Sequence, residues 1–85
     1  MAEADPHLTF NPNTATAEAI VLFLRLNIPG FRITRDVKHS WTSVLIPSAL
    51  GGETVIGSAS TKLGALREAA HRVKLFGAEA LRRAW

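Results

Sequence analysis

The residues best placed to do chemistry lie near the carboxyl end, where Thr61 and Lys62 follow a run of small residues. The Thr61 hydroxyl can cap the first turn of a helix, and Lys62 puts a positive charge in that turn. Exposed amide groups at a helix start, together with the helix dipole, favour anions such as phosphate. The order of these two residues therefore predicts an anion-binding helix start.

Positive charge is concentrated in the last third of the chain. Residues 61–85 contain six Lys or Arg against two Glu, a net charge of +4, whereas residues 1–30 carry −2 and residues 31–60 carry +1. A basic helix face attracts polyanions, although an ordinary solvated face has the same pattern. At 100° per residue, one side of the predicted last helix holds Arg67, His71, Lys74 and Arg82.

The side chains that usually carry catalysis or metal binding do not form a recognisable pattern. His7, His39 and His71 are widely separated, with no cysteine or carboxylate at metal-ligand spacing. Ser58 has no G-x-S-x-G context, and Gly51-Gly52 has neither the lysine nor the hydroxyl of a phosphate loop. We therefore expect no enzyme activity, no metal and no cofactor.

Length and composition indicate one small domain. The chain has 85 residues, of which 47% are hydrophobic, enough for one core but not for two. The absence of cysteine excludes disulfides and fits a cytoplasmic protein. The longest aliphatic and aromatic run, Ala19 to Leu24, is too short to span a membrane, so we expect no membrane partner. Residues 1–12 are expected to be a flexible arm and residues 13–85 a single domain.

Helical periodicity follows the arm. Asn13 or Thr14 can cap a helix that runs to about Asn27, where Pro29-Gly30 ends it. Further apolar residues lie outside its main stripe, so this helix is expected to be deeply packed or covered by a partner. The main stripe consists of Ala17, Ile20, Val21, Leu24 and Ile28, and the additional apolar residues are Leu22, Phe23 and Leu26.

Three strands and a second helix complete the chain. Residues 31–37, 41–46 and 53–58 have strand-like composition, and their short connections favour an antiparallel meander. The middle strand is apolar on both faces. The last helix starts at Ser60 or Thr61, and Gly77 is a candidate break before a short second piece. Its predicted apolar stripe consists of Leu66, Ala69, Val73, Phe76, Ala80 and Ala84. The order is helix, three strands, helix, which is an α+β domain.

Residues 57–70 resemble the carboxyl-terminal signature of the double-stranded RNA-binding domain. The resemblance extends over roughly residues 13–76, and it implies an α-β-β-β-α fold with a three-stranded antiparallel sheet and two helices packed on one face. Leu63 and Leu66 stand where the family has its second and third lysines. The matching positions are the small residues Gly57 and Ala59, the hydroxyl of Thr61, the first lysine Lys62, and the alanines Ala65, Ala69 and Ala70.

The resemblance also implies a mode of RNA binding. In that family the first helix, the loop between the first two strands and the lysine-bearing helix start contact duplex RNA through its shape, phosphates and 2′-hydroxyls. Carried over, the loop offers Lys38 and His39, and the first helix offers only Glu18. The two leucines remove phosphate contacts that would release counterions, and Arg67, next to Leu66, is placed to compensate in part.

The sequence thus predicts a small non-enzymatic domain that binds the backbone of duplex RNA or DNA. The alternative is a protein-interaction or homodimerisation module, because family members with degraded lysines often serve that purpose. An exposed patch of Val44 and Ile46, or of Leu22 and Phe23, would invite a partner or a second copy. The candidate nucleic-acid-binding residues are Lys38, His39, Thr61, Lys62, Arg67, His71 and Lys74.

Overall fold

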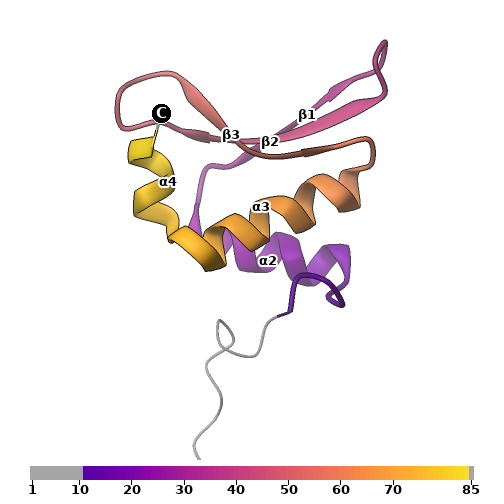
Figure 1. Ribbon diagram of the computed structural model, residues 1–85, viewed down its shortest axis with the longest axis horizontal. Helices are drawn as coiled ribbons and strands as arrows, with labels where there is room; N and C mark the ends of the chain where they lie inside the picture. The colour runs from indigo at the N-terminus through magenta and orange to yellow at the C-terminus, as the bar shows by residue number, and fades with distance from the viewer. Residues whose placement is uncertain (1–10, 85) are drawn as a thin grey trace, which may run out of the picture.

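A three-stranded antiparallel sheet with two helices on one face forms the body of the molecule (Figure 1). The structure, a computed structural model, describes residues 11–84. This confirms the predicted α+β architecture, to which a short third helix is added. The elements are α2 (Ala17–Asn27), β1 (Arg32–Asp36), β2 (Trp41–Pro47), β3 (Glu53–Ala59), α3 (Lys62–Phe76) and α4 (Ala78–Ala84). Over residues 11–84, no helix is long and apolar enough to cross a membrane.

Helix α2 begins later than Asn13 or Thr14, so that prediction is wrong. The Asn11 carbonyl accepts a hydrogen bond from the Ala15 amide at 2.9 Å, and the Asn11 side chain accepts one from the Asn13 amide at 3.0 Å. These bonds make a separate turn of residues 11–14. Thr16 then caps the helix, its hydroxyl oxygen accepting from the amide of Ala19 at 3.2 Å.

The two faces of the sheet differ in burial. Thr42, Val44 and Ile46 of β2 lie on the inner face and are buried under the helices. Val44 and Ile46 therefore do not form an exposed patch, contrary to one of the predicted alternatives. On the outer face Trp41 and Val55 remain 46% and 44% exposed. A bulge in β3, between the pairs Val44–Gly57 and Leu45–Val55, leaves Ile56 without a paired residue on β2.

Gly57 lets α3 lie directly on β3. A Cβ atom at this position would be 2.5 Å from the Ala65 carbonyl oxygen and 2.6 Å from the Ala69 nitrogen, closer than real Cβ contacts. The small residues of the motif therefore serve close packing of strand and helix. The α3 residues buried by this packing and by contact with α2 are Ala65, Leu66, Ala69, Ala70 and Val73.

The carboxyl end of α3 departs from the predicted single stripe. Gly77 has φ +85°, and it ends α3 before α4 begins. Phe76, expected in the core, is 58% exposed, whereas Leu81 of α4 is buried. The Ala49 amide donates to the Arg82 carbonyl at 3.0 Å, which ties α4 to the loop between β2 and β3.

The amino-terminal part of α2 also differs from its predicted stripe. Ile20 and Leu24 are buried as expected, but Phe23 is buried as well and Ala17 is exposed. Phe23 therefore contributes to the core and not to an outer patch. Leu22 and Leu26 are the large apolar residues of this helix that remain exposed.

Candidate nucleic-acid interface

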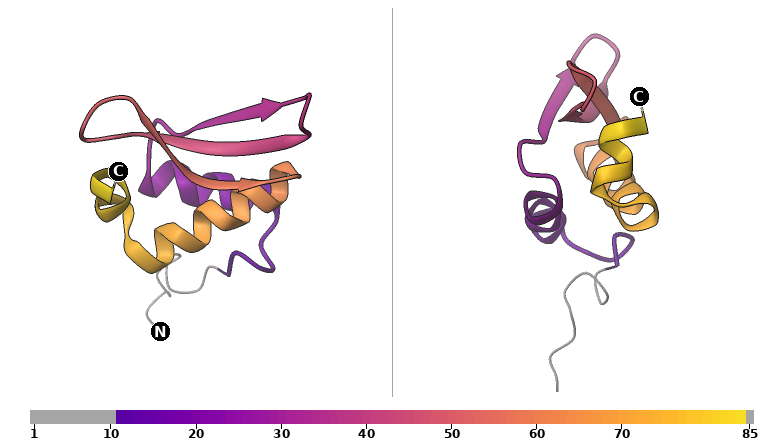
Figure 2. Two further views of the ribbon diagram at one scale, coloured as in Figure 1. Left: turned by 45° about the horizontal axis from the view of Figure 1, so that its top comes forward. Right: turned by 90° about the vertical axis from the view of Figure 1, so that its left-hand side faces the viewer.

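Three segments that are far apart in the sequence come together at one end of the molecule. Helices α2 and α3 run side by side in the same direction, so both begin at this end, and the turn between β1 and β2 lies above them (Figures 1 and 2). They comprise the first helix, the loop between the first two strands and the lysine-bearing helix start, which are the three segments predicted to contact RNA. We call this end of the molecule, formed by residues 17–25, 37–40 and 60–63, the loop end.

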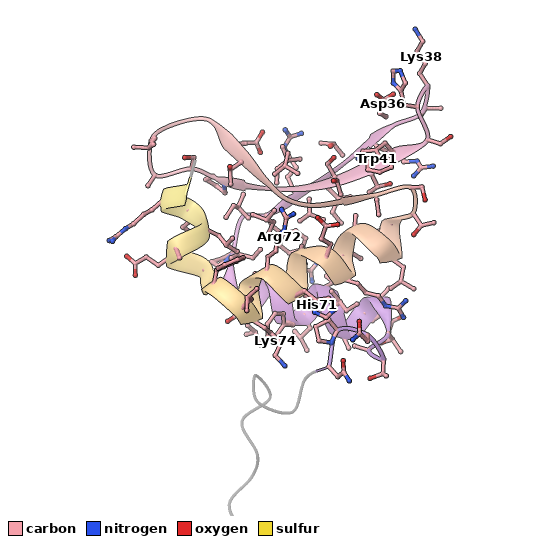
Figure 3. All side chains as sticks on the ribbon, viewed as in Figure 1. Asp36, Lys38, Trp41, His71, Arg72 and Lys74 are labelled. Carbon is pink, nitrogen blue, oxygen red and sulfur yellow. The ribbon has the colours of Figure 1, made fainter. Side chains whose placement is uncertain are left out.

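The β1–β2 turn contains Lys38 and His39, and the side chains of these two residues have different surroundings. Lys38 points away from the fold at the tip of the turn (Figure 3). His39 is bonded to Asp36. The Asp36 carboxylate accepts a hydrogen bond from the His39 amide at 3.2 Å and lies 2.7 Å from the imidazole Nδ1. The hydrogen bond from the His39 ring, and then that from its amide, hold the pKa of the Asp36 carboxyl below its ordinary value. Lys38 is thus the outward cation of this turn.

The start of α3 has the predicted cap. The Thr61 hydroxyl oxygen accepts a hydrogen bond from the Gly64 amide at 3.0 Å, and Lys62 is exposed in the first helical turn. The cap satisfies one of the free amides of the helix start and leaves those of Lys62 and Leu63 for a ligand or water. The start of α3 therefore combines a side-chain cap with an exposed lysine in the first turn.

Arg25, in the last turn of α2, is the other cation near Lys62. Both residues line a hollow of about 460 Å³ between α2 and α3, and an adjoining one of about 350 Å³ that extends to β1. Glu18 also lines the larger hollow. Sequence reasoning missed Arg25 because it lies outside the apolar stripe. Its spacing of seven residues from Glu18, which places both on one helix face, was the available signal.

Arg35 connects the two basic segments. Its Nη1 atom donates to the Thr42 hydroxyl and to the Ser60 carbonyl, both at 2.7 Å. The first bond satisfies a buried hydroxyl, and the second holds the β3–α3 turn against the sheet. Sequence reasoning also missed Arg35. A charged residue at an inward position of β1, in register with Thr42, was the signal that could have revealed it.

Leu63 and Leu66, which stand at the family's second and third lysine positions, belong to the hydrophobic core or pack against it. Leu66 is fully buried, and Leu63 is half-buried in the wall of the larger hollow. Arg67 does not simply replace them, since its Nε atom is buried and has no hydrogen-bond partner among the described residues. The loop end therefore presents Lys62 without the neighbouring cations that the resemblance would supply.

His71 and Lys74 lie on a different part of the surface from Lys38. They face the underside of α3 as drawn in Figure 3, where the His71 Nε2 atom lies 2.8 Å from the side-chain oxygen of Asn13. The structure thus divides the predicted site. It brings Lys38, His39, Thr61 and Lys62 to the loop end and leaves His71 and Lys74 apart from them.

Comparison with known proteins gives no family for this chain. No protein-family model, curated protein or solved structure matches it. Within residues 11–84, no group of three or more histidine, aspartate or glutamate side chains could hold a metal ion. The case for a function therefore rests on the geometry of the loop end.

Proposed function

We propose that this domain binds the sugar-phosphate backbones of a nucleic-acid duplex, RNA or DNA, with its loop end. The observation that carries the proposal is the pair of hydrogen bonds from Arg35 to Thr42 and Ser60, which hold the β1–β2 hairpin and the α3 start in a fixed relation. Two basic segments separated by more than twenty residues thereby act as one surface. Such a surface suits shape and phosphate recognition more than base readout.

The charges at this end favour a polyanion. Among the described residues, Arg25 and Lys62 take part in none of the ion pairs, and Lys38 is exposed at the tip of its turn. The nearby carboxylates are those of Glu18 and Asp36, and the Asp36 carboxylate is already paired with His39. A phosphate near Lys62 would also meet the free amides and the positive dipole end of α3. No cofactor or catalytic step is part of the proposal.

Lys62→Ala should weaken duplex binding severalfold and reduce the slope of log K against log salt by about 0.9, because one phosphate contact is lost. The loss stays moderate because the amides of the capped helix start remain. Fluorescence anisotropy with labelled 20-base-pair RNA and DNA, titrated from ~50 to ~200 mM salt, measures both quantities. The matched control is Lys74→Ala, which removes the same charge from a different surface. Equal effects of the two variants, or no binding at low salt, would contradict the proposal.

Protein interaction remains a second candidate, favoured by the uncovered outer face of the sheet. Leu45 and Val55 are paired on this face, Trp41 lies four residues along β2 from Leu45, and none of the described helices packs over them (Figure 2). Exposed aromatic and aliphatic residues on one sheet face are typical of interaction surfaces.

If a second copy covers this face, sedimentation velocity should show a concentration-dependent increase in mass that Val55→Lys abolishes. Lysine is tolerated at Val55 because the side chain is already 44% exposed. Leu50→Lys, at an exposed loop position, is the matched control. A monomer at all concentrations would exclude the homodimer form of this candidate, and the duplex-binding proposal would stand unaffected.

A further inference from the structure

The larger hollow at the loop end, between α2 and the start of α3, is lined mostly by apolar side chains. Its volume of about 460 Å³ falls within the range of about 300–1,000 Å³ that is typical of ligand sites. Leu66 is fully buried and Leu22 is 59% exposed, so an occupant would cover apolar surface that is now in water. The apolar residues that line the hollow are Ala17, Val21, Leu22, Leu63 and Leu66.

Arg25 and Lys62 stand where this hollow meets a second one. The second hollow, of about 350 Å³, extends to β1 and shares Val21, Arg25 and Lys62 with the first. Within residues 11–84, neither cation takes part in an ion pair. Their charges are complementary to an anionic group placed at the junction of the two hollows. An occupant of the larger hollow that fits these charges therefore has an anion next to an apolar body.

Glu18 adds a carboxylate to the lining of the same hollow. It precedes Arg25 by seven residues on one face of α2, which is about 10 Å along the helix axis. A carboxylate accepts hydrogen bonds, so Glu18 fits an occupant with N–H donors at the end remote from its anion. An acyl chain has no such donors. The lining therefore matches an anion, an apolar body and a donor edge, in that order.

We propose that the larger hollow receives the unpaired base of a bulged nucleotide, with the nucleotide's phosphate at Arg25 and Lys62. An unpaired base leaves the stack at low cost, and proteins read such bases by apolar contacts and by hydrogen bonds to their Watson–Crick edge. Guanine fits Glu18 best, because it presents two adjacent N–H donors on that edge and a carboxylate can accept both. The inference rests on the proposed duplex binding and adds to it a preference for a bulge.

Anisotropy titrations with three labelled RNA duplexes measure this preference. One duplex is fully paired, one has a bulged guanine, and one has an abasic nucleotide at the bulge, which keeps the phosphate and removes the base. We expect the guanine bulge to bind about tenfold more tightly than the other two. Equal affinities for the guanine and abasic bulges would overturn the inference and leave the duplex-binding proposal intact. No binding of any duplex would overturn both.

A side chain that fills the hollow should remove the preference. Ala17 is exposed and lines the hollow, whereas Ala19, two residues along α2, is exposed and does not line it. Ala17→Phe should reduce the ratio of affinities for the guanine and abasic bulges to about twofold or less, and the matched control Ala19→Phe should retain it. The same ratio in both variants would contradict a site in the hollow.

Glu18→Gln tests the carboxylate with almost no change of size. Uracil has a carbonyl oxygen on each side of its single N–H donor, so a guanine bulge should bind the wild type about fivefold more tightly than a uracil bulge. This ratio should fall to about twofold or less in Glu18→Gln. An unchanged ratio would overturn the role of Glu18. Displacement of a paired duplex by dodecyl phosphate, without any preference for the guanine bulge, would assign the hollow to an anionic amphiphile and overturn the inference.

Discussion

Replacing Gly57 with valine should destabilise the domain by about 3 kcal/mol or more, at the upper end of overpacking effects. The added Cβ would meet backbone atoms of Ala65 and Ala69, which cannot rotate away as a side chain could. Strand β3 and helix α3 would have to separate along their contact. A domain of this size has a free energy of unfolding toward the low end of about 5–15 kcal/mol, so most of its stability would be lost.

Thermal denaturation followed by circular dichroism gives the result directly, since each kcal/mol shifts Tm by about 4–8 °C in a domain of 60–100 residues. Gly57→Ala should be intermediate, because it adds the clashing Cβ and nothing beyond it. Ser58→Val is the matched control: it makes a β-branched residue one position along the same strand, on the outer face, and should change stability by at most about 0.5 kcal/mol. A Gly57→Val protein with nearly unchanged Tm would mean that α3 does not lie on β3 as described.

Leu63→Lys should strengthen duplex binding about tenfold at ~50 mM salt and steepen the salt slope by about 0.9, since one more phosphate can be neutralised. Leu63 follows Lys62 in the first turn of α3 and is only half-buried. A lysine there can keep its aliphatic stem along the wall of the hollow and extend its ammonium group to solvent. The change restores the second lysine that the family resemblance implies.

Leu75→Lys is the control for net charge, because it adds the same residue to the other end of α3 at an exposed position. Anisotropy titrations on the two variants and the wild type, with RNA and DNA duplexes, separate a site from a general charge effect. A gain confined to Leu63→Lys supports the loop end as the binding surface. Equal gains in both variants, or none in Leu63→Lys, would argue against it.

Local sequence patterns predicted the helices and strands well at positions whose structure depends on a residue's own backbone or on its immediate neighbours in the chain. The Thr61 cap, the exposed Lys62 and the break at Gly77 follow from short-range rules, and each is present. The later start of α2 was missed because Asn11 makes hydrogen bonds that compete with a first helical turn. Phe76 was placed in the core because periodicity extends a stripe through a helix end that tertiary packing leaves exposed.

The candidate site was harder to predict because it depends on residues that meet only in the folded chain. Arg25 joins Lys62 through the side-by-side packing of α2 and α3, and Arg35 reaches Ser60 across the sheet. The spacing of Arg25 from Glu18 and the inward position of Arg35 in β1 were signals for these two residues, but neither signal indicates the partner that each residue meets. Conversely, Arg67 and Lys62 look equally basic in the sequence, but the packing of α3 buries the Nε atom of Arg67 and leaves Lys62 exposed.

The hydrogen bonds of Arg35 have a thermodynamic consequence for any ligand of the loop end. Because Thr42 and Ser60 are joined through one guanidinium group, the spacing between the β1–β2 hairpin and the start of α3 is set during folding. A ligand that bridges the two segments then loses little binding free energy to the ordering of the protein, a cost that flexible segments incur on association. The domain would therefore favour ligands whose anionic groups are already separated by the distance between the β1–β2 hairpin and the start of α3.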